Sequence, residues 1–439
     1  MPIRNEEIVT VISHSLKLPR EHITPDLKYH DLPAWDSLGH IYLITELERH
    51  FNIRIPMENI YTLQSVDLIC NYILNKKTGD DLPVEKHTEE IHRGLKGIYF
   101  DETRISCIDP DASHISYRHY DLQYLVQHNC CEEVIYLMIF EELPKPDELT
   151  KFLQELFLLR KETFCYFNQQ QSAKSAADQP LQIIQFLLHL QMNQHHTLPP
   201  HAIYGAALLF ICLLNGYEYN ATSELNIDQL LGNTFHLDAA RISLLKQGMI
   251  MLMEHGANAG AFSLRITAST GNNFLLSLCS SIITFTGNKH GGAIADVNEF
   301  LQLLKRTSNR EWFIETCIQN NINIPGFGHR LYKKEDPRVV CISALIDVIE
   351  TDKESAGHLL LCREVLQILE KYKPYGLIPN VDFFTSMLFS LLKIPPQCFL
   401  PVFIVSRIPG LIAHYNEQQE NNILIRPNLK YNGKQIITQ

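Results

Sequence analysis

The chain has 439 residues, of which 45% are hydrophobic and 20% charged, and its formal net charge is −11. This composition is ordinary for a globular protein, and the length suits two or three domains. The acidic excess argues against a nucleic-acid groove or an anionic membrane as the partner. The longest apolar run, 202–214, is shorter than the roughly 18–20 residues that cross a bilayer, so it predicts a buried core helix.

Cysteine usage and the first residues predict a cytoplasmic protein. The eleven cysteines are scattered without CxxC or Cys/His zinc spacing, which indicates reduced thiols and gives no sign of a metal site. The sequence MPIRNEEIVTV places acidic residues directly before a short amphipathic segment, which is unlike a secretory signal.

A change of composition divides the chain. The sequence NKKTGDDLPVEKHTEE, at 75–90, replaces an apolar-periodic stretch with charged residues, Gly and Pro, as linkers do. We predict a first domain at 1–76, a linker at 77–93 and a second domain at 94–439. In the second domain, residues 97–120 predict a short antiparallel ribbon, and helical periodicity recurs at 147–160, 180–193, 201–214, 238–254, 297–307 and 358–372.

The segment AWDSLGHIYLITELERHF, at 34–51, predicts a helix with an exposed start. Either Asp36 or Ser37 can cap this helix, because its side-chain oxygen can accept a hydrogen bond from a free backbone N–H. Trp35, just upstream, is expected to serve packing. The apolar positions that fall near one face are Leu38, Ile41, Ile44 (or Leu43), Leu47 and Phe51.

With FNIRIP and SVDLICNYI further on, this segment resembles the prosthetic-group site of acyl carrier proteins. The resemblance implies a small four-helix bundle at 1–76 that carries 4′-phosphopantetheine on the hydroxyl of Ser37. It also implies two partners, a phosphopantetheinyl transferase and an enzyme that loads the carrier. The alternative is that Ser37 is only a helix cap.

Three short segments occur in this order in the second half of the chain: GNKHGG at 287–292, PGFGHRLYKKEDPR at 325–338 and NVDFF at 380–384. Together they resemble the active site of citrate synthases, and the resemblance extends over roughly 94–433. It implies an all-α chain in which a large, two-subdomain citrate synthase-like fold, with a small subdomain inserted at approximately 220–335, follows the carrier. A lone histidine or aspartate would mean little, since such residues are usually hydrogen-bonders or helix caps.

The resemblance assigns catalytic roles to three residues. Joining the methyl carbon of a thioester to the ketone of oxaloacetate requires removal of an α-proton, stabilisation of the enol oxygen and protonation of the attacked carbonyl. By resemblance, Asp382 is the base, His290 hydrogen-bonds the thioester oxygen, and His329 donates to the oxaloacetate carbonyl.

A dicarboxylate substrate needs fixed cations, and the planar fork of arginine matches a carboxylate. By resemblance, Arg338, Arg407 and Arg426 bind oxaloacetate, together with His255. In the family the arginine equivalent to Arg426 reaches the neighbouring subunit's site, so a homodimer is expected. The alternative for each arginine is a solvated surface role.

The acyl donor remains open between a carrier-bound thioester and free acetyl- or acyl-coenzyme A. By resemblance, Arg330 and Lys333, with Lys334 beside them, contact coenzyme A or the carrier arm. The leading hypothesis is a condensation of carrier-bound acyl groups with oxaloacetate, in secondary metabolism, that gives citrate, an alkylcitrate or a citryl thioester. The alternatives are a coenzyme A-dependent citrate or 2-methylcitrate synthase whose carrier serves another step, and a catalytically weakened scaffold.

Four positions depart from the family pattern. Gly260 stands in the stretch where the family has a small hydroxyl residue that helps to orient the histidine corresponding to His290. Ile294 replaces an Asn, Asn288-Lys289 replaces Pro-Leu, and His119 replaces a Gly. The first two differences predict an altered environment, and a lower activity, at His290.

Overall fold

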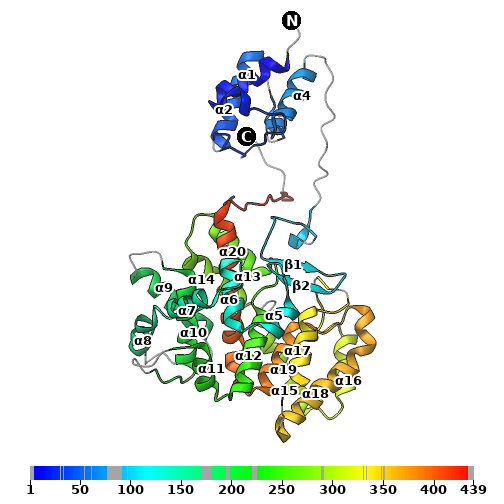
Figure 1. Cartoon of the computed structure of the whole chain (residues 1–439). Helices are drawn as coiled ribbons and strands as arrows, with labels where there is room; N and C mark the ends of the chain where they lie inside the picture. Colours follow the sequence, from blue (N-terminus) through cyan, green and yellow to red (C-terminus); the bar gives the residue numbers. More distant parts are fainter. Residues whose placement is uncertain are drawn as a thin grey trace. The chain divides into compact units, whose positions relative to one another are not determined.

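A computed structural model describes residues 4–29, 31–32, 34–53, 55–60, 62–76, 91–95, 97–170, 179–193, 198–219, 225–287, 291–329, 331–332, 334–347, 349 and 352–433. Its contacts divide the chain into an N-terminal unit, 1–98, and a C-terminal unit, 99–439 (Figure 1). Each unit has its own hydrophobic core. Most of the predicted linker, 77–90, lies outside the described residues, so the predicted domain bounds remain predictions.

The N-terminal unit is a small helical bundle. Its helices are α1 (Asn5–Leu16), α2 (Ser37–Phe51), α3 (Met57–Ile60) and α4 (Val66–Lys76). Asp36 is the N-cap of α2, and its carboxylate accepts a hydrogen bond from the Gly39 N–H at 2.7 Å. Trp35 is fully buried, and its indole N–H donates to Nδ1 of His40 at 3.0 Å, which confirms a packing role.

The predicted apolar face of α2 is wrong at one of the positions whose side chains are described; the side chain of Leu38 is not among them. Ile41 is 49% exposed, whereas the neighbouring His40 is buried and receives the indole hydrogen bond. The buried stripe of α2 comprises His40, Leu43, Ile44, Leu47 and Phe51. This spacing of three and four residues follows one helix face, from which Ile41 is displaced by about 100°.

The C-terminal unit begins with the predicted antiparallel ribbon and continues as helices. Strands β1 (Ser106–Asp109), β2 (His114–Tyr117) and β3 (Tyr120–Asp121) form an antiparallel sheet in that order. The next helices are α5 (Leu122–His128), α6 (Cys131–Phe140), α7 (Pro146–Leu156), α8 (Arg160–Gln169), α9 (Gln179–Asn193) and α10 (Pro200–Leu214). The single helix predicted at 147–160 is wrong, because α7 ends at Leu156 and a turn precedes α8.

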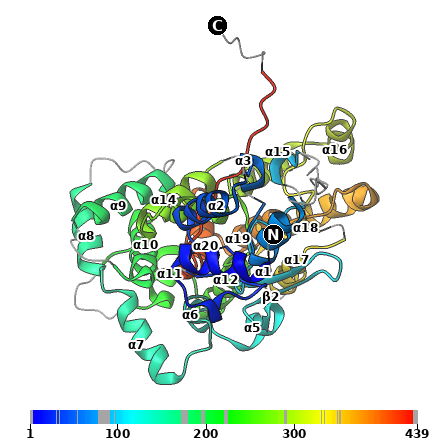
Figure 2. The ribbon, with the colours of Figure 1, turned by 90° about the horizontal axis from the view of Figure 1, so that it is seen from above.

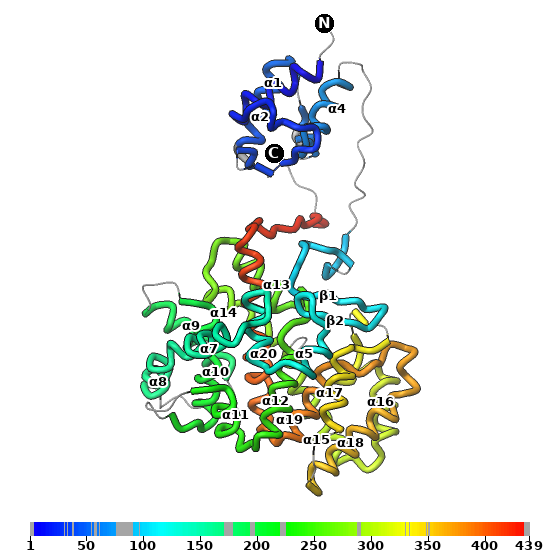
Figure 3. Tube along the Cα trace, viewed as in Figure 1, coloured from blue at the N-terminus to red at the C-terminus, as the bar shows by residue number. Residues whose placement is uncertain are grey.

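The second half of the C-terminal unit is also helical. Its helices are α11 (Ile227–Phe235), α12 (Ala239–Leu252), α13 (Ala259–Ser269), α14 (Phe274–Phe285), α15 (Ala293–Arg306), α16 (Arg310–Gln319), α17 (Pro337–Asp347), α18 (Lys353–Leu369), α19 (Val381–Leu391) and α20 (Phe399–Glu420). Within this unit, α15–α18 gather on one side and α7–α11 on the other, with α12, α19 and α20 between them (Figures 1 and 3). The mostly α-helical fold is confirmed, and the bounds of the inserted subdomain remain a prediction.

Helix α20 is the central helix of the C-terminal unit. It packs against α6, α10, α12, α13 and α14, and Figure 2 shows it from above among α6, α10, α12 and α14. The stretch Pro396–Glu420 is long and apolar enough to cross a membrane, but 89% of its most apolar window is buried inside the protein. We therefore interpret it as a core helix, as we do α10, which is buried from 201 to 213.

Candidate active site

The structure brings together five of the predicted site residues from four segments of the C-terminal unit. His255 follows α12, and His329 lies in the loop before α17. Arg338 lies in the first turn of α17, Asp382 in the first turn of α19, and Arg407 in the middle of α20. Because these segments are far apart in sequence, their meeting is a result of tertiary packing.

Two of the three sequence motifs lie directly against each other. The Gly328 N–H donates to the carbonyl of Ile378 at 2.7 Å, and the Asn380 N–H donates to the carbonyl of Gly326 at 2.9 Å. Gly326 has a φ of +81°, and a Cβ there would lie 2.8 Å from the Cβ of Phe383. Glycine is therefore required for this close approach, which places the loop of His329 beside the start of α19.

Asp382 has the properties of a general base. The side chain of Asn380 caps α19 by accepting hydrogen bonds from the backbone N–H groups of Asp382 (3.0 Å) and Phe383 (3.4 Å). Burial raises the pKa of the Asp382 carboxyl to about 6, against the opposing positive charges of Arg338 and Arg407. A carboxylate with a pKa near the working pH is ionised yet basic enough to accept a proton from carbon.

His329 is arranged as a neutral hydrogen-bond donor. Its Nδ1 accepts from the backbone N–H groups of Leu331 (3.0 Å) and Tyr332 (3.1 Å), which implies that Nε2 carries the proton. Burial lowers the pKa of His329 to about 4; Asp336 opposes this shift and Arg338 adds to it. The imidazole is therefore neutral near pH 7 and can offer an N–H to a carbonyl oxygen.

Asp336 and Arg338 form a buried ion pair next to His329. Both oxygens of the Asp336 carboxylate accept from the Arg338 guanidinium, at 3.0 and 2.6 Å, and neither side chain is more than 3% exposed. Burial raises the pKa of the Asp336 carboxyl, but the charge and hydrogen bonds of Arg338 outweigh it and hold that pKa below its ordinary value. The pair fixes one positive charge in the site.

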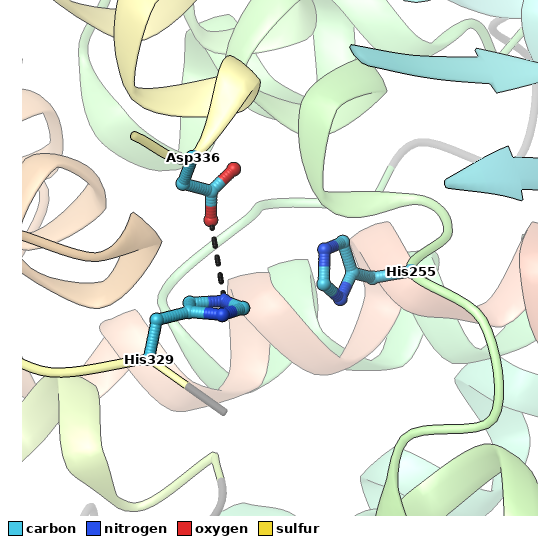
Figure 4. A group of neighbouring side chains, drawn as sticks. All are labelled: His255, His329 and Asp336. Atoms are coloured by element: carbon cyan, nitrogen blue, oxygen red, sulfur yellow. Dashed lines mark ion pairs between the residues drawn. The ribbon is translucent and has the colours of Figure 1, made fainter. Parts of the chain in front are cut away.

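Figure 4 shows His255, His329 and Asp336 close together, and their possible ligand atoms lie within 4.8 Å of one another. Nε2 of His329 lies 3.6 Å from the Asp336 carboxylate. A cation there would compete with the Arg338 guanidinium, which already binds both carboxylate oxygens. The donor set is therefore a poor metal site.

His255 faces His329 across the site. The two rings are 5.7 Å apart and nearly perpendicular, and Nε2 of His255 lies 3.2 Å from the Tyr332 hydroxyl. Burial holds the pKa of His255 well below its ordinary value, and Arg338 and Arg407 add to the effect. His255 is therefore a neutral hydrogen-bonding group.

Arg407 provides a second positive charge, and part of its guanidinium has no hydrogen-bond partner among the described residues. Its side chain is 3% exposed, and its Nε and Nη1 have no hydrogen-bond partner among the described residues. Burial lowers the pKa of Arg407 to about 10, and the carboxylate of Glu254 opposes this shift. An unpartnered buried guanidinium is costly, so this arrangement is suited to an anionic ligand that supplies the missing acceptors.

The structure does not place every predicted site residue. His290, Arg330 and Lys333 lie outside the described residues, and so does the side chain of Ser37, whose backbone begins α2. Arg426 lies beyond α20, is exposed, and forms no hydrogen bond or ion pair with the described part of this chain. Its role in a neighbouring subunit's site remains a prediction.

Two of the departures from the family pattern have a structural counterpart. A Cβ at Gly260 would lie 2.6 Å from the ring of Phe285 and 3.1 Å from the hydroxyl of Ser281, so an aromatic ring fills the space of a side chain there. Ile294 is completely buried. His119 is an exposed residue whose ring packs on Tyr120 at 4.3 Å, outside the site. Asn288 and Lys289 lie outside the described residues.

Sequence reasoning missed three residues that organise the site: Glu254, Tyr332 and Asp336. Two of them lie inside the quoted motif at 325–338, and Glu254 directly precedes His255. For Glu254 and Asp336 the only local signal is an acidic residue close to a predicted site residue, and Asp336 lies two residues before its partner Arg338. The partners of Glu254 and Tyr332, which are His414 and His255, come into reach only in the folded chain.

Two family models match the chain. The model described as "Citrate synthase, C-terminal domain" matches residues 94–428, and the model described as "Phosphopantetheine attachment site" matches residues 6–73. The first covers most of the chain, and the second covers α1 to α4 up to residue 73.

Individual proteins give the same result for the C-terminal unit. A citrate synthase of Haloferax volcanii is 29% identical, over 79% of this chain and 96% of its own length. A 2-methylcitrate synthase of Mycobacterium tuberculosis is 27% identical, over 80% and 93%. Among solved structures, citrate synthase from Thermotoga maritima has a TM-score of 0.69 at 24% identity, with 80% of this chain and 98% of that chain covered. The Thermoplasma acidophilum enzyme, in a complex with carboxymethyl coenzyme A and oxaloacetate, has a TM-score of 0.73 at 19% identity, with the same coverage.

Proposed function

This chain belongs to the citrate synthase family and carries a phosphopantetheine carrier domain, and on that premise we propose that it condenses a carrier-bound acyl thioester with oxaloacetate. The product is citrate, an alkylcitrate or a citryl group still held on the carrier. The observation that carries the proposal is the buried, partly unpartnered guanidinium of Arg407 beside Arg338, His329 and Asp382. Such a site suits a dicarboxylate with a carbonyl group.

In the proposed reaction each described residue has one task. Arg338 and Arg407 bind the two carboxylates of oxaloacetate, and the Nε2–H of His329 hydrogen-bonds the ketone oxygen. Asp382 removes an α-proton from the acyl thioester, and the resulting enol carbon attacks the ketone carbon. The new alkoxide takes a proton from His329. His255 adds a hydrogen bond to oxaloacetate, and His290 is assigned the thioester oxygen by family resemblance.

The carrier supplies the donor by tethering. A phosphopantetheine arm on Ser37 ends in the same thiol as coenzyme A, so the thioester is chemically identical at the reacting end. A linker of about 15 residues spans roughly 20 Å on average and raises the local donor concentration to about the millimolar range. Arg330 and Lys333 are proposed to contact the arm.

The proposal also covers the oligomeric state of the protein, its partner enzymes and its location in the cell. A homodimer brings Arg426 of one subunit to the site of the other, where it adds a cation for oxaloacetate. A phosphopantetheinyl transferase modifies Ser37, and a separate enzyme loads the acyl group. We place the protein in the cytoplasm and in secondary metabolism, because central metabolism has free acetyl-coenzyme A as donor.

The test is intact-protein mass spectrometry on chain that is phosphopantetheinylated and acetyl-loaded at Ser37, with oxaloacetate and no free coenzyme A. We expect a mass gain for a citryl carrier, or loss of the acetyl group with citrate in solution. Asp382→Asn is the matched control and should keep its acetyl group. An acetyl group that persists in the unmutated protein refutes carrier delivery.

The second candidate is a coenzyme A-dependent synthase, favoured by the names of the relatives and by the coenzyme A derivative in the Thermoplasma complex. In that case Ser37→Ala turns over free acetyl-coenzyme A and oxaloacetate at the unmutated rate, while the loaded carrier is inert. A third candidate, the weakened scaffold, predicts no turnover with either donor.

A further inference from the structure

A row of buried polar side chains lies behind Arg407 and is not used by the reaction described above. It runs from Glu254 through His414 to Arg265, and each of the three is at most 2% exposed. His414 lies seven residues after Arg407, two turns further along α20. Glu254, at the inner end of the row, directly precedes His255 and accepts from the Gly256 N–H, so this end of the row adjoins the site.

The hydrogen bonds of His414 determine its tautomer. Its Nδ1 accepts from Nε of Arg265 at 2.9 Å, and a guanidinium can only donate. Nε2 must then carry the proton of the neutral ring, and it lies 3.0 Å from the carboxylate of Glu254. His414 is thus a donor to Glu254 whose orientation is fixed from the other side.

Glu254 is the group through which this row reaches the substrate site. Its other oxygen accepts from the Ser106 hydroxyl at 3.1 Å and from the Gly256 N–H, which closes the turn that carries His255. Burial raises the pKa of Glu254, but His414 and Arg407 outweigh it and keep that pKa below its ordinary value. Glu254 therefore stays ionised, and its two oxygens accept hydrogen bonds from His414, Ser106 and Gly256.

The outer end of the row is fixed at the start of the C-terminal unit. Arg265 binds Glu417, and it also lies 3.4 Å from Asp101. Glu417 in turn accepts from the backbone N–H of Arg104 at 2.7 Å and from the hydroxyl of Thr103. Every polar group of the row consequently has a partner, so the position of Glu254 is determined by packing rather than by solvent.

We propose that His414 is a positioning residue for oxaloacetate binding: its Nε2–H holds the Glu254 carboxylate in the place where it accepts from the Gly256 N–H and so fixes the turn that carries His255. The proposal rests on the proposed function, because oxaloacetate is taken as a ligand of His255. His414 touches no reacting atom, and its effect appears in the affinity for oxaloacetate.

Two substitutions test this role, and each keeps only one of the two hydrogen bonds of His414. In His414→Gln the amide N–H can take the place of Nε2–H and donate to Glu254. In His414→Asn the amide oxygen can take the place of Nδ1 and accept from Arg265, but the side chain is too short for Glu254. Oxaloacetate binding to the full chain is measured by calorimetry in a Ser37→Ala background, which removes the carrier arm and any turnover through it. We expect affinity within about threefold of the parent for Gln and weaker by about 10- to 100-fold for Asn.

The control and the outcomes separate the possible failures. His201→Asn removes another buried histidine that pairs with a carboxylate, Glu155 at 3.4 Å, away from the site, and should leave the affinity unchanged. Equal affinity in both His414 variants, or a lower Tm for His414→Asn with unchanged affinity, overturns the positioning role and leaves the proposed function standing. If the parent chain itself fails to bind oxaloacetate, both proposals are overturned.

Discussion

Replacing Asp382 by Asn should inactivate the protein and also make it more stable. Burial raises the pKa of this carboxyl from 3.8 to about 6 in the folded chain. Below pH 3.8 the group is protonated in the folded and unfolded states alike. Between pH 3.8 and pH 6 this carboxyl ionises in the unfolded chain before it does so in the folded chain, so the free energy of unfolding falls as the pH rises. Above pH 6 this decrease is complete.

The magnitude follows from the size of the shift. About two pKa units correspond to about 3 kcal/mol of folding free energy lost at pH 8, and to about half of that at pH 5. Asn resembles the protonated carboxyl in being neutral and nearly the same size. The free energy of unfolding of Asp382→Asn should therefore exceed that of the unmutated protein by at most about 3 kcal/mol at pH 8, and by about half as much at pH 5. Its kcat should fall about 100-fold or more.

The assay is calorimetric unfolding of both proteins at pH 5 and pH 8, with turnover measured on the same samples. Asp347→Asn, at an exposed carboxylate paired with Arg363, is the matched control and should show no gain that depends on pH in this way. A variant that is less stable than the parent at pH 8, or a difference that is the same at both pH values, would refute the reasoning about Asp382.

Three further variants test other parts of the structure. Arg407→Met should weaken oxaloacetate binding about 100-fold or more in calorimetry, because the buried guanidinium has two nitrogens free to bind an anionic ligand; an unchanged affinity would contradict this. Gly326→Ala should destabilise the C-terminal unit by about 2–4 kcal/mol, because of its positive φ and the contact with Phe383; an unchanged unfolding midpoint would contradict this. Trp35→Phe removes the hydrogen bond to His40 and should cost the N-terminal unit about 1 kcal/mol in chemical denaturation; a change in the C-terminal unit instead would count against separate cores.

The fold brings together five residues that the motifs name, whose roles remain predictions, whereas the helical periodicity misplaces the ends of α7 and α8. His255, His329, Arg338, Asp382 and Arg407 could be named because their chemistry is carried by short motifs in a fixed order. Their partners could not be named, because a buried carboxylate is defined by what it meets in three dimensions. The pKa values that give the site its character arise from that burial and not from neighbours in sequence.

Two errors at the level of helices have physical causes. A Cβ at Gly205 would lie 1.8 Å from the carbonyl oxygen of Leu156, so α10 runs directly against the end of α7. Both α7 and α8 pack on α10, and the apolar spacing therefore continues through the turn that separates them. In α2, a histidine takes a core position because Trp35 and the carbonyl of Ile60 satisfy both of its ring nitrogens. A search for apolar residues at helical spacing leaves out such a histidine.

The hydrogen bonds between Glu417 and residues 103–104 have a consequence for how the chain could be rebuilt. They hold the beginning of the C-terminal unit against the last turn of its final helix. Where two such segments of a compact unit lie together, a domain that is attached at one of them can be attached at the other with little strain. The carrier domain could therefore be moved from the front of the chain to the back with a linker of similar length, and the C-terminal unit itself would need no other change.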